Sequence, residues 1–218
     1  MTPEFTPFPK ISRLNRECWV TEKLDGTNST VAIFDADGRP VPCAIAEWTA
    51  ADGRNLFMLA GSRTRWITPE QDNHGFAKWV SKHAEELKGL GEGIHRGEWW
   101  GSGIQRGYGL KNGEKRFSLF NVQRWCLAGT EPKRIETEDP RIEKWQEELP
   151  TCCELVPVLY RGQFDTLAID GAIASLQAHG SFAVDGFDDP EGVVVYHTAG
   201  NVAFKRTIKN DDKPKSKP

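Results

Sequence analysis

The stretch "EKLDGTN", residues 22–28, places an aspartate directly before a glycine and a lysine two positions before that aspartate. It lies between "CWVTEKL", which starts at Cys18, and "NSTVAIF", which ends at Phe34, and both runs are rich in strand-forming residues. The pattern predicts strand, turn, strand, with Lys23 at the end of the first strand and Gly26 permitting a tight reversal. Taken alone, such a turn is an ordinary charged hairpin, so its meaning depends on the rest of the chain.

The composition indicates a globular protein. The chain has 218 residues, 38% of them hydrophobic, which is enough to bury a substantial core. It contains no apolar run of 18 residues and no N-terminal signal pattern, so we expect a cytoplasmic protein without a membrane partner. The net charge of −3 argues against indiscriminate coating of nucleic acid but allows a local basic groove, and residues 204–218 are locally basic.

The cysteines and histidines show no metal-binding spacing. The cysteine count is odd and includes no C-x-x-C pair, so we interpret the cysteines as reduced structural thiols. The histidines have no H-x-x-H or H-E-x-x-H spacing, so we expect no zinc site. These residues are Cys18, Cys43, Cys126, Cys152 and Cys153, and His74, His83, His95, His179 and His197.

The remaining pattern predicts an α+β fold. Residues 75–90 carry an apolar stripe typical of a helix. A second helix is predicted within residues 164–180, with Asp165 as N-cap and Gly180 as terminator. The apolar runs within residues 190–208, separated by the turn sequence "TAGN", predict a hairpin.

No repeat or linker divides the chain, so we expect one domain over residues 1–210, built on antiparallel sheets flanked by helices. Residues 211–218 are expected to form a disordered basic tail. We expect neither an OB-fold nor a separate C-terminal domain, because few residues follow Lys209.

Six charged motifs recur along the chain in a definite order. Together they resemble the covalent nucleotidyltransferases, the superfamily of ATP-dependent ligases and messenger-RNA capping enzymes, and within it most closely the RNA ligases. The resemblance covers roughly residues 7–209 and implies an ATP-grasp-like ligase fold. The motifs are "EKLDGTN", "GSRTR", "HRGEWWG", "RFSLFNV", "PEGVVVYH" and "VAFKRTIKN".

The resemblance makes Lys23 the nucleophile that attacks the α-phosphorus of ATP. A lysine with the ordinary pKa near 10.4 is uncharged in only about 0.04% of molecules at pH 7. The site must therefore lower the pKa of the lysine or remove its proton, and nearby positive charge from Lys205 or a metal ion would do the former.

The resemblance also assigns the nucleotide-binding roles. Glu22 would lie near the adenine edge, Asp25 would orient the nucleophile loop, and Arg63 would contact the sugar or the phosphate of the adenylated end. Glu98 would hold the ribose or an associated metal, and Phe120 would stack on adenine.

The last two motifs would bind phosphates and metal. Glu191 would help to hold Mg²⁺ or Mn²⁺, and Lys205 would grip the α-phosphate. Arg206, Thr207 and Lys209 are alternative candidates for the second position of the last motif, as phosphate or RNA contacts.

Two further features bear on the resemblance. Asn121 replaces the aspartate that many relatives have after the stacking aromatic. Arg106 and Tyr108, in the Gly-rich "GSGIQRGYG", are candidate nucleic-acid contacts.

The resemblance implies an ATP-dependent RNA ligase that joins 5′-phosphate and 3′-hydroxyl ends through lysyl-AMP and an adenylated RNA end. We expect a monomer acting on nicked or bridged duplex ends, with an accessory protein or RNA-binding partner as a further option. A phage origin and a role in RNA repair, splicing or evasion of phage defence stay open. The alternatives are a DNA nick ligase, a capping-type guanylyltransferase, and a silent module that binds nucleotides or RNA ends.

Overall fold

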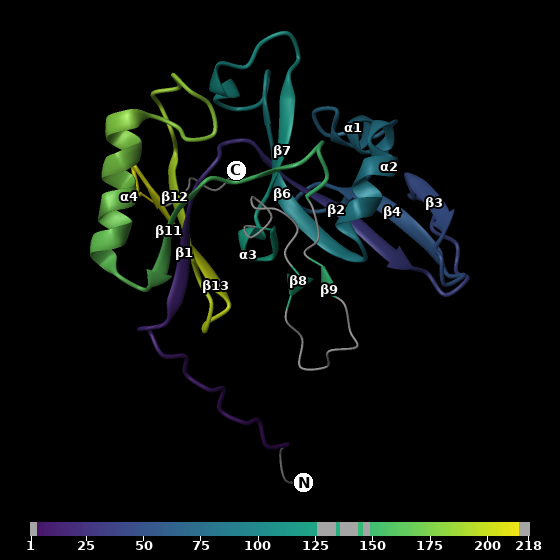
Figure 1. The fold of residues 1–218 in the computed structure, drawn as a ribbon, viewed down its shortest axis with the longest axis horizontal. Coiled ribbons are helices and arrows are strands. Elements are labelled where there is room, and N and C mark those ends of the chain that lie inside the picture. The colour runs from purple at the N-terminus through teal and green to yellow at the C-terminus, as the bar shows by residue number, and fades with distance from the viewer. Residues whose placement is uncertain (1–3, 126–133, 136–143, 146–148, 214–218) are drawn as a thin grey trace. The chain divides into compact units, whose positions relative to one another are not determined.

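The computed structural model describes residues 4–125, 134–135, 144–145 and 149–213 (Figure 1). The chain forms two compact units, the first of Met1–Lys23 and Pro157–Pro218 and the second of Leu24–Val156. The sequence predicted one domain over residues 1–210, and the structure divides that range inside the quoted "EKLDGTN". The predicted α+β class with antiparallel sheets is confirmed in both units.

The first unit is a four-stranded antiparallel sheet with one long helix packed on it (Figure 1). Strand residues of alternating position, such as Cys18 and Val20, share the face that packs against apolar residues of the helix, including Ile173 and Leu176. In sheet order the strands are β11 (Val158–Gln163), β1 (Glu17–Glu22), β12 (Gly192–His197) and β13 (Val202–Thr207), and the helix is α4 (Thr166–His179).

Two local predictions for this unit are confirmed. The carboxylate of Asp165 accepts a hydrogen bond from the backbone N–H of Leu167 at the start of α4, and Gly180 ends the helix with a φ of 78°. The predicted C-terminal hairpin is formed by β12 and β13, in whose register Val194 lies opposite Lys205.

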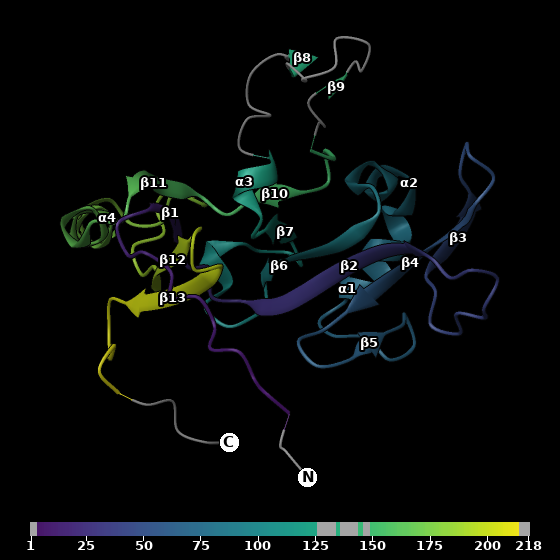
Figure 2. The same ribbon diagram turned by 90° about the horizontal axis from the view of Figure 1, so that it is seen from below.

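The second unit is built on a larger sheet, in which the six-strand path is antiparallel except where β10 joins β7 in parallel. Its core is aromatic, and the ring of Phe76 contacts those of Trp99 and Phe117. In path order the strands are β10 (Glu154–Leu155), β7 (Lys115–Leu119), β6 (Gly93–Gly101), β2 (Thr27–Asp35), β4 (Asn55–Gly61) and β3 (Ala46–Thr49), with β5 (Trp66–Ile67) on β4 and β8 (Arg134–Ile135) paired with β9 (Lys144–Trp145) (Figure 2).

The helices of this unit are short. The helix predicted over residues 75–90 is interrupted at His83, whose φ of −104° and ψ of 18° are not helical. It therefore appears as separate helical segments. These segments are α1 (Phe76–Lys82), α2 (Ala84–Leu87) and the 3₁₀ turn η1 (Lys88–Leu90). The unit also contains α3 (Val122–Trp125) and the 3₁₀ turn η2 (Gly107–Gly109).

The predicted hairpin around Gly26 is wrong. β1 pairs with β11 and β12, whereas β2 pairs with β4 and β6, so the two runs enter different sheets. Gly26 is required for close approach and not for reversal. A Cβ atom there would lie 2.4 Å from the carbonyl oxygen of Trp99 and 2.7 Å from the Cβ of Trp100.

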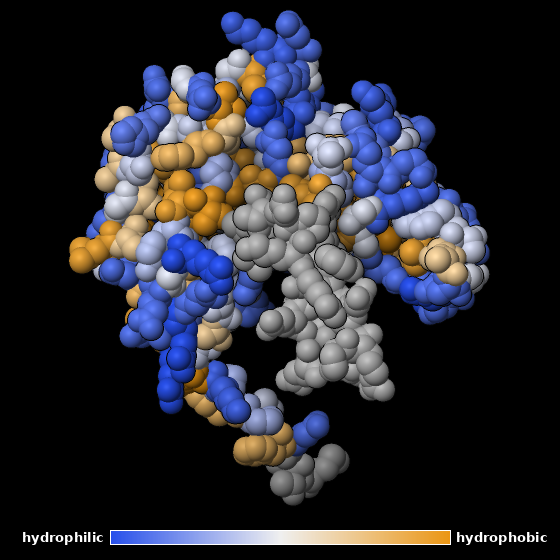
Figure 3. Space-filling view, viewed as in Figure 1, coloured by the Kyte–Doolittle hydropathy of each residue, from blue (hydrophilic) through white to orange (hydrophobic). Residues whose placement is uncertain are grey.

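Hydrophilic residues predominate on the face drawn in Figure 3, as expected when the large apolar side chains fill two cores. Within the described ranges, no helix combines the length and the apolar character needed to cross a lipid bilayer.

Gly97→Ala is expected to lower the free energy of unfolding by at least about 2 kcal/mol, because the new methyl group overpacks the sheet. Its Cβ would lie 2.4 Å from the carbonyl oxygen of Ser118 and 2.7 Å from the ring of Phe117. Gly171→Ala is the matched control, since no atom lies within 4 Å of its Cβ in α4, and should gain about 0.5–1 kcal/mol. Urea unfolding measures the free energy of unfolding of both variants and of wild type. A Gly97→Ala variant as stable as wild type would contradict the packing described here.

Candidate active site

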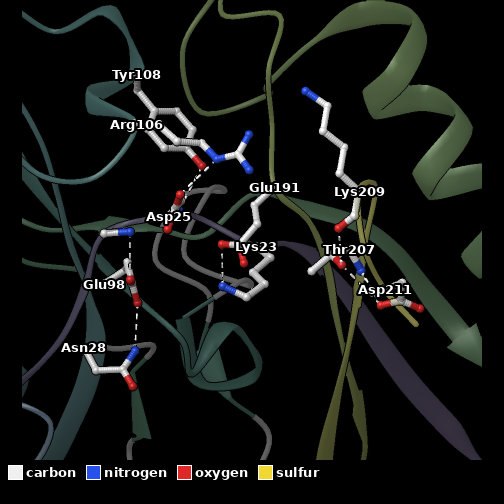
Figure 4. A network of polar contacts seen from close by, with 11 residues as sticks. Lys23, Asp25, Asn28, Glu98, Arg106, Tyr108, Glu191, Thr207, Lys209 and Asp211 are labelled. Atoms are coloured by element: carbon white, nitrogen blue, oxygen red, sulfur yellow. Dashed lines mark hydrogen bonds and ion pairs between the residues drawn. The ribbon is translucent and has the colours of Figure 1, made fainter. Parts of the chain in front are cut away.

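Lys23 forms an ion pair with Glu191 within the first unit (Figure 4). Its Nζ donates to Oε2 of Glu191 at 2.6 Å, and its backbone N–H donates to the carbonyl of Gly192 at 2.8 Å. The two side chains are only 21% and 14% exposed. The register that places Glu22 opposite Val193 in β1 and β12 brings together residues 168 positions apart.

Glu22 is a buried carboxylate with its own partners. It is 1% exposed, its Oε1 accepts from the hydroxyl of Ser181 at 2.6 Å, and its Oε2 accepts from the N–H of Phe182 at 2.8 Å. Burial raises the pKa of Glu22 above its usual value, and these hydrogen bonds oppose that shift. The contact between Glu22 and adenine stays a prediction. In such a contact, adenine would bind carboxylate oxygens that already accept hydrogen bonds from Ser181 and Phe182.

A Gly-rich loop holds Asp25 within the second unit (Figure 4). The backbone N–H of Asp25 donates to the hydroxyl of Tyr108 at 2.9 Å, and Nε of Arg106 donates to its carboxylate at 2.9 Å. Tyr108 is buried with a φ of 52°, between glycines of positive φ at 107 and 109. The sequence suggested Arg106 and Tyr108 only as candidate nucleic-acid contacts. The glycines around them were the one sequence signal that could have indicated a tightly folded loop at this place.

Glu98 holds the turn from the neighbouring strand β6. It is 6% exposed, and its two oxygens accept from the backbone N–H of Gly26 at 3.0 Å and from the side-chain amide of Asn28 at 2.9 Å. The predicted role at the ribose or metal stays a prediction. A carboxylate oxygen has more than one acceptor position, so these bonds leave that role open.

Phe120 is an exposed aromatic at the end of β7. It is 42% exposed, whereas Phe117 three residues earlier is fully buried in the core. This exposure suits a stacking surface better than a core position. Asn121 accepts a hydrogen bond from the N–H of Arg124 at 3.2 Å and so caps α3, which gives this asparagine a structural use. Arg63 is exposed between β4 and β5, and its nucleotide contact stays a prediction.

The cationic residues of the last motif have different surroundings. Lys205 is exposed on β13, and Arg206, the next residue in the strand, forms an ion pair with Asp170 of α4. Nζ of Lys209 instead lies 2.7 Å from the carboxylate of Asp189, in the segment that leads to Glu191. Arg206 and Lys209 each have an aspartate partner, so the identity of the second phosphate contact stays a prediction.

Thr207 and the start of the predicted tail have a structural role. The backbone N–H of Thr207 donates to the carboxylate of Asp211 at 2.8 Å, which places Asp211 in a turn after β13. The rest of the predicted tail from residue 214 lies outside the described residues, as does Cys126.

Comparison with known proteins agrees with the family that the motifs resemble. The family model described as RNA ligase matches residues 16–210. The chain belongs to the RNA ligase family. No curated protein matches it by sequence.

Solved structures of the Naegleria gruberi RNA ligase share the fold of this chain. One with pyrophosphate is 18% identical with a TM-score of 0.51, and covers 97% of this chain and 60% of that one. A variant with ATP and Mn is also 18% identical, with a TM-score of 0.52 and coverages of 90% and 51%. The chain thus spans about half to three-fifths of the length of these structures.

Glu22 predicts a measurable pH dependence. A folded-state pKa raised above the unfolded value stabilises the protein below the unfolded pKa, near 4.3, and this contribution is lost as pH rises through the folded pKa. The free energy of unfolding of wild type minus that of Glu22→Gln should therefore fall as pH rises from about 4.5 towards 7.5. Thermal unfolding across this range checks it, with exposed Glu4→Gln as control. A difference independent of pH would refute the assignment.

Proposed function

We propose that this RNA ligase uses ATP to join RNA 5′-phosphate and 3′-hydroxyl ends through AMP bonded covalently to Lys23. The observation that carries the proposal is the contact between Nζ of Lys23 and the carboxylate of Glu191 at 2.6 Å. An amine that acts as a nucleophile must lose its proton, and the carboxylate of Glu191 is the adjacent acceptor for the proton of Lys23.

The first step begins with proton transfer. The ammonium of Lys23 gives a proton to Glu191, and the freed electron pair of Nζ attacks the α-phosphorus of ATP. A P–N bond forms while the bond from the α-phosphorus to the bridging oxygen breaks, and pyrophosphate leaves. Lys205 and Lys209 lie on or directly after β13 and would offset the charge of the phosphates.

The later steps move the AMP. The 5′-phosphate of an RNA end attacks the phosphorus of lysyl-AMP, which restores the lysine and leaves the end adenylated. A 3′-hydroxyl then attacks the 5′-phosphate and AMP departs. We place these ends in a nicked or bridged duplex, because preformed geometry replaces binding energy that a small protein cannot supply.

The residues present fit a divalent cation of the Mg²⁺ or Mn²⁺ type, since hard cations take carboxylate oxygens. Glu191 would hold it once it has passed the proton of Lys23 to water, and Glu98 is an alternative candidate in the second unit. Both carboxylates are largely withdrawn from solvent. When bound, the cation neutralises negative charge on the phosphates.

Lys23→Ala should abolish covalent labelling by α-labelled ATP with Mg²⁺ or Mn²⁺, because it removes the only atom that can carry the AMP. Denaturing gels measure the label, and the exposed Lys78→Ala should be labelled like wild type. Undiminished label on Lys23→Ala would end the proposal. Labelling by GTP instead of ATP would identify a capping-type enzyme, and sealing of DNA but not RNA nicks would identify a DNA ligase.

Tyr108→Phe should slow formation of the lysine adenylate by about 2- to 10-fold, because one net hydrogen bond of about 0.5–1.5 kcal/mol no longer fixes the N–H of Asp25. Its ring still packs on Trp100. Single-turnover labelling measures the rate. Tyr160→Phe, which loses a hydroxyl bond to the carbonyl of Gln163, is the matched control and should keep the wild-type rate. Equal rates for all three proteins would show that the tyrosine does not position the turn.

A further inference from the structure

A second cluster of reactive side chains lies within the second unit. His83 stands at the junction of α1 and α2, Glu86 lies in α2, and Cys152 belongs to the segment that enters β10. Their ligand atoms all lie within 4.8 Å of one another. None of these residues belongs to the motifs that carry the ligase chemistry.

Neighbouring contacts hold two of these groups in place. Nδ1 of His83 lies 2.8 Å from one carboxylate oxygen of Glu86, and the other oxygen accepts from the hydroxyl of Thr151 at 2.8 Å. The ring of His83 also packs against Trp79, with 5.1 Å between ring centroids. A carboxylate tied by an outer hydrogen bond and an imidazole fixed by packing are usual supports of metal ligands.

The helix break explains how the cluster arises. The apolar stripe of residues 75–90 would place His83 on the buried side of one continuous helix, but α1 ends there, with the N–H of His83 bonded to the carbonyl of Trp79. His83 is consequently only partly buried, and Glu86, three residues later, reaches its imidazole. Cys152 comes from 66 positions beyond Glu86, so no local spacing could reveal the cluster.

The donor set selects a class of metal. Thiolate, imidazole and carboxylate together suit Zn²⁺, whose tetrahedral ligand atoms stand roughly 3.4–3.6 Å apart given its usual bond lengths. The ligand atoms lie within 4.8 Å of one another, and Nδ1 of His83 lies 2.8 Å from Glu86. Side-chain rotation would therefore open the His83–Glu86 pair and draw the thiolate in as the ion binds. Cys153 is 5% exposed in the core, and its sulfur lies 4.0 Å from that of Cys152, so we assign three protein ligands and a fourth position to water.

We propose that His83, Glu86 and Cys152 form a Zn²⁺ site that fastens the junction of α1 and α2 to the segment entering β10. The expectation of no zinc site rested on motif spacing, which tests only ligands that lie close together in the chain. All three ligands belong to the second unit and none to the ligase motifs, so the ion would stabilise that unit and would not take part in phosphoryl transfer.

Titration of the full-length protein with Co²⁺, a spectroscopic substitute for Zn²⁺, tests the site without ATP. Wild type should bind one ion per chain with a thiolate-to-cobalt charge-transfer absorption, which Zn²⁺ displaces. Cys152→Ser should lose this absorption, and Glu86→Gln should weaken binding by at least about 10-fold. Cys43→Ser, which changes another partly exposed thiol, and Lys23→Ala should both keep it.

Thermal unfolding gives a second readout. Saturating Zn²⁺ should raise the Tm of wild type and of Lys23→Ala but not that of Cys152→Ser. If Cys152→Ser does not fold, Glu86→Gln, altered at a side chain 43% exposed, decides the same comparison. No charge-transfer absorption in wild type, or an equal signal and Tm shift in Cys152→Ser, would overturn the site whatever the outcome of the ATP labelling.

Discussion

The backbone register between β1 and β12 is the constraint on which the reactive lysine depends. It places Glu22 opposite Val193, so the residues that follow one strand and precede the other, Lys23 and Glu191, meet at 2.6 Å. A slip of one residue would send alternate side chains to the other face of the sheet and separate the pair. The buried partners of β1 in the core of the first unit fix that register, since Cys18 and Val20 must face α4.

The residues after the lysine are restrained by a different set of contacts. Within the second unit, Asp25 is held by Arg106 and Tyr108, and the backbone of Gly26 is held by Glu98. These contacts use two backbone N–H groups and two carboxylates, so the turn has little conformational freedom to lose. Preorganisation of this kind is what adenylation at a single amine requires.

Packing and polar satisfaction also account for the special residues of the motifs. Gly26 is glycine because the backbone of Trp99 leaves no room for a side chain. Glu22 can be buried because Ser181 and Phe182 supply donors to both of its oxygens. Asn121 accepts a hydrogen bond from the backbone of α3, so the local fold accounts for an asparagine at this position.

The sequence by itself determined the features that depend on neighbouring residues. The N-cap of α4 at Asp165, the C-terminal hairpin and the α+β class follow from local propensity and alternation, and the ordered motifs identified the RNA ligase family over residues 16–210. Exposure of Phe120 agrees with its predicted stacking role, which local pattern alone could not separate from a core position.

Only the tertiary structure decided the features that join distant parts of the chain. Strand propensity contains no information on partners, so the runs on either side of "EKLDGTN" predicted a hairpin, although hydrogen bonding places them in separate sheets. Likewise, the hydrogen bond between Tyr108 and Asp25 joins residues 83 positions apart, and the cluster of Cys152 with His83 joins residues 69 positions apart. Both arise from packing and lie beyond the range of any sequence periodicity. Local chemistry selects the residues, and long-range pairing decides which of them act together.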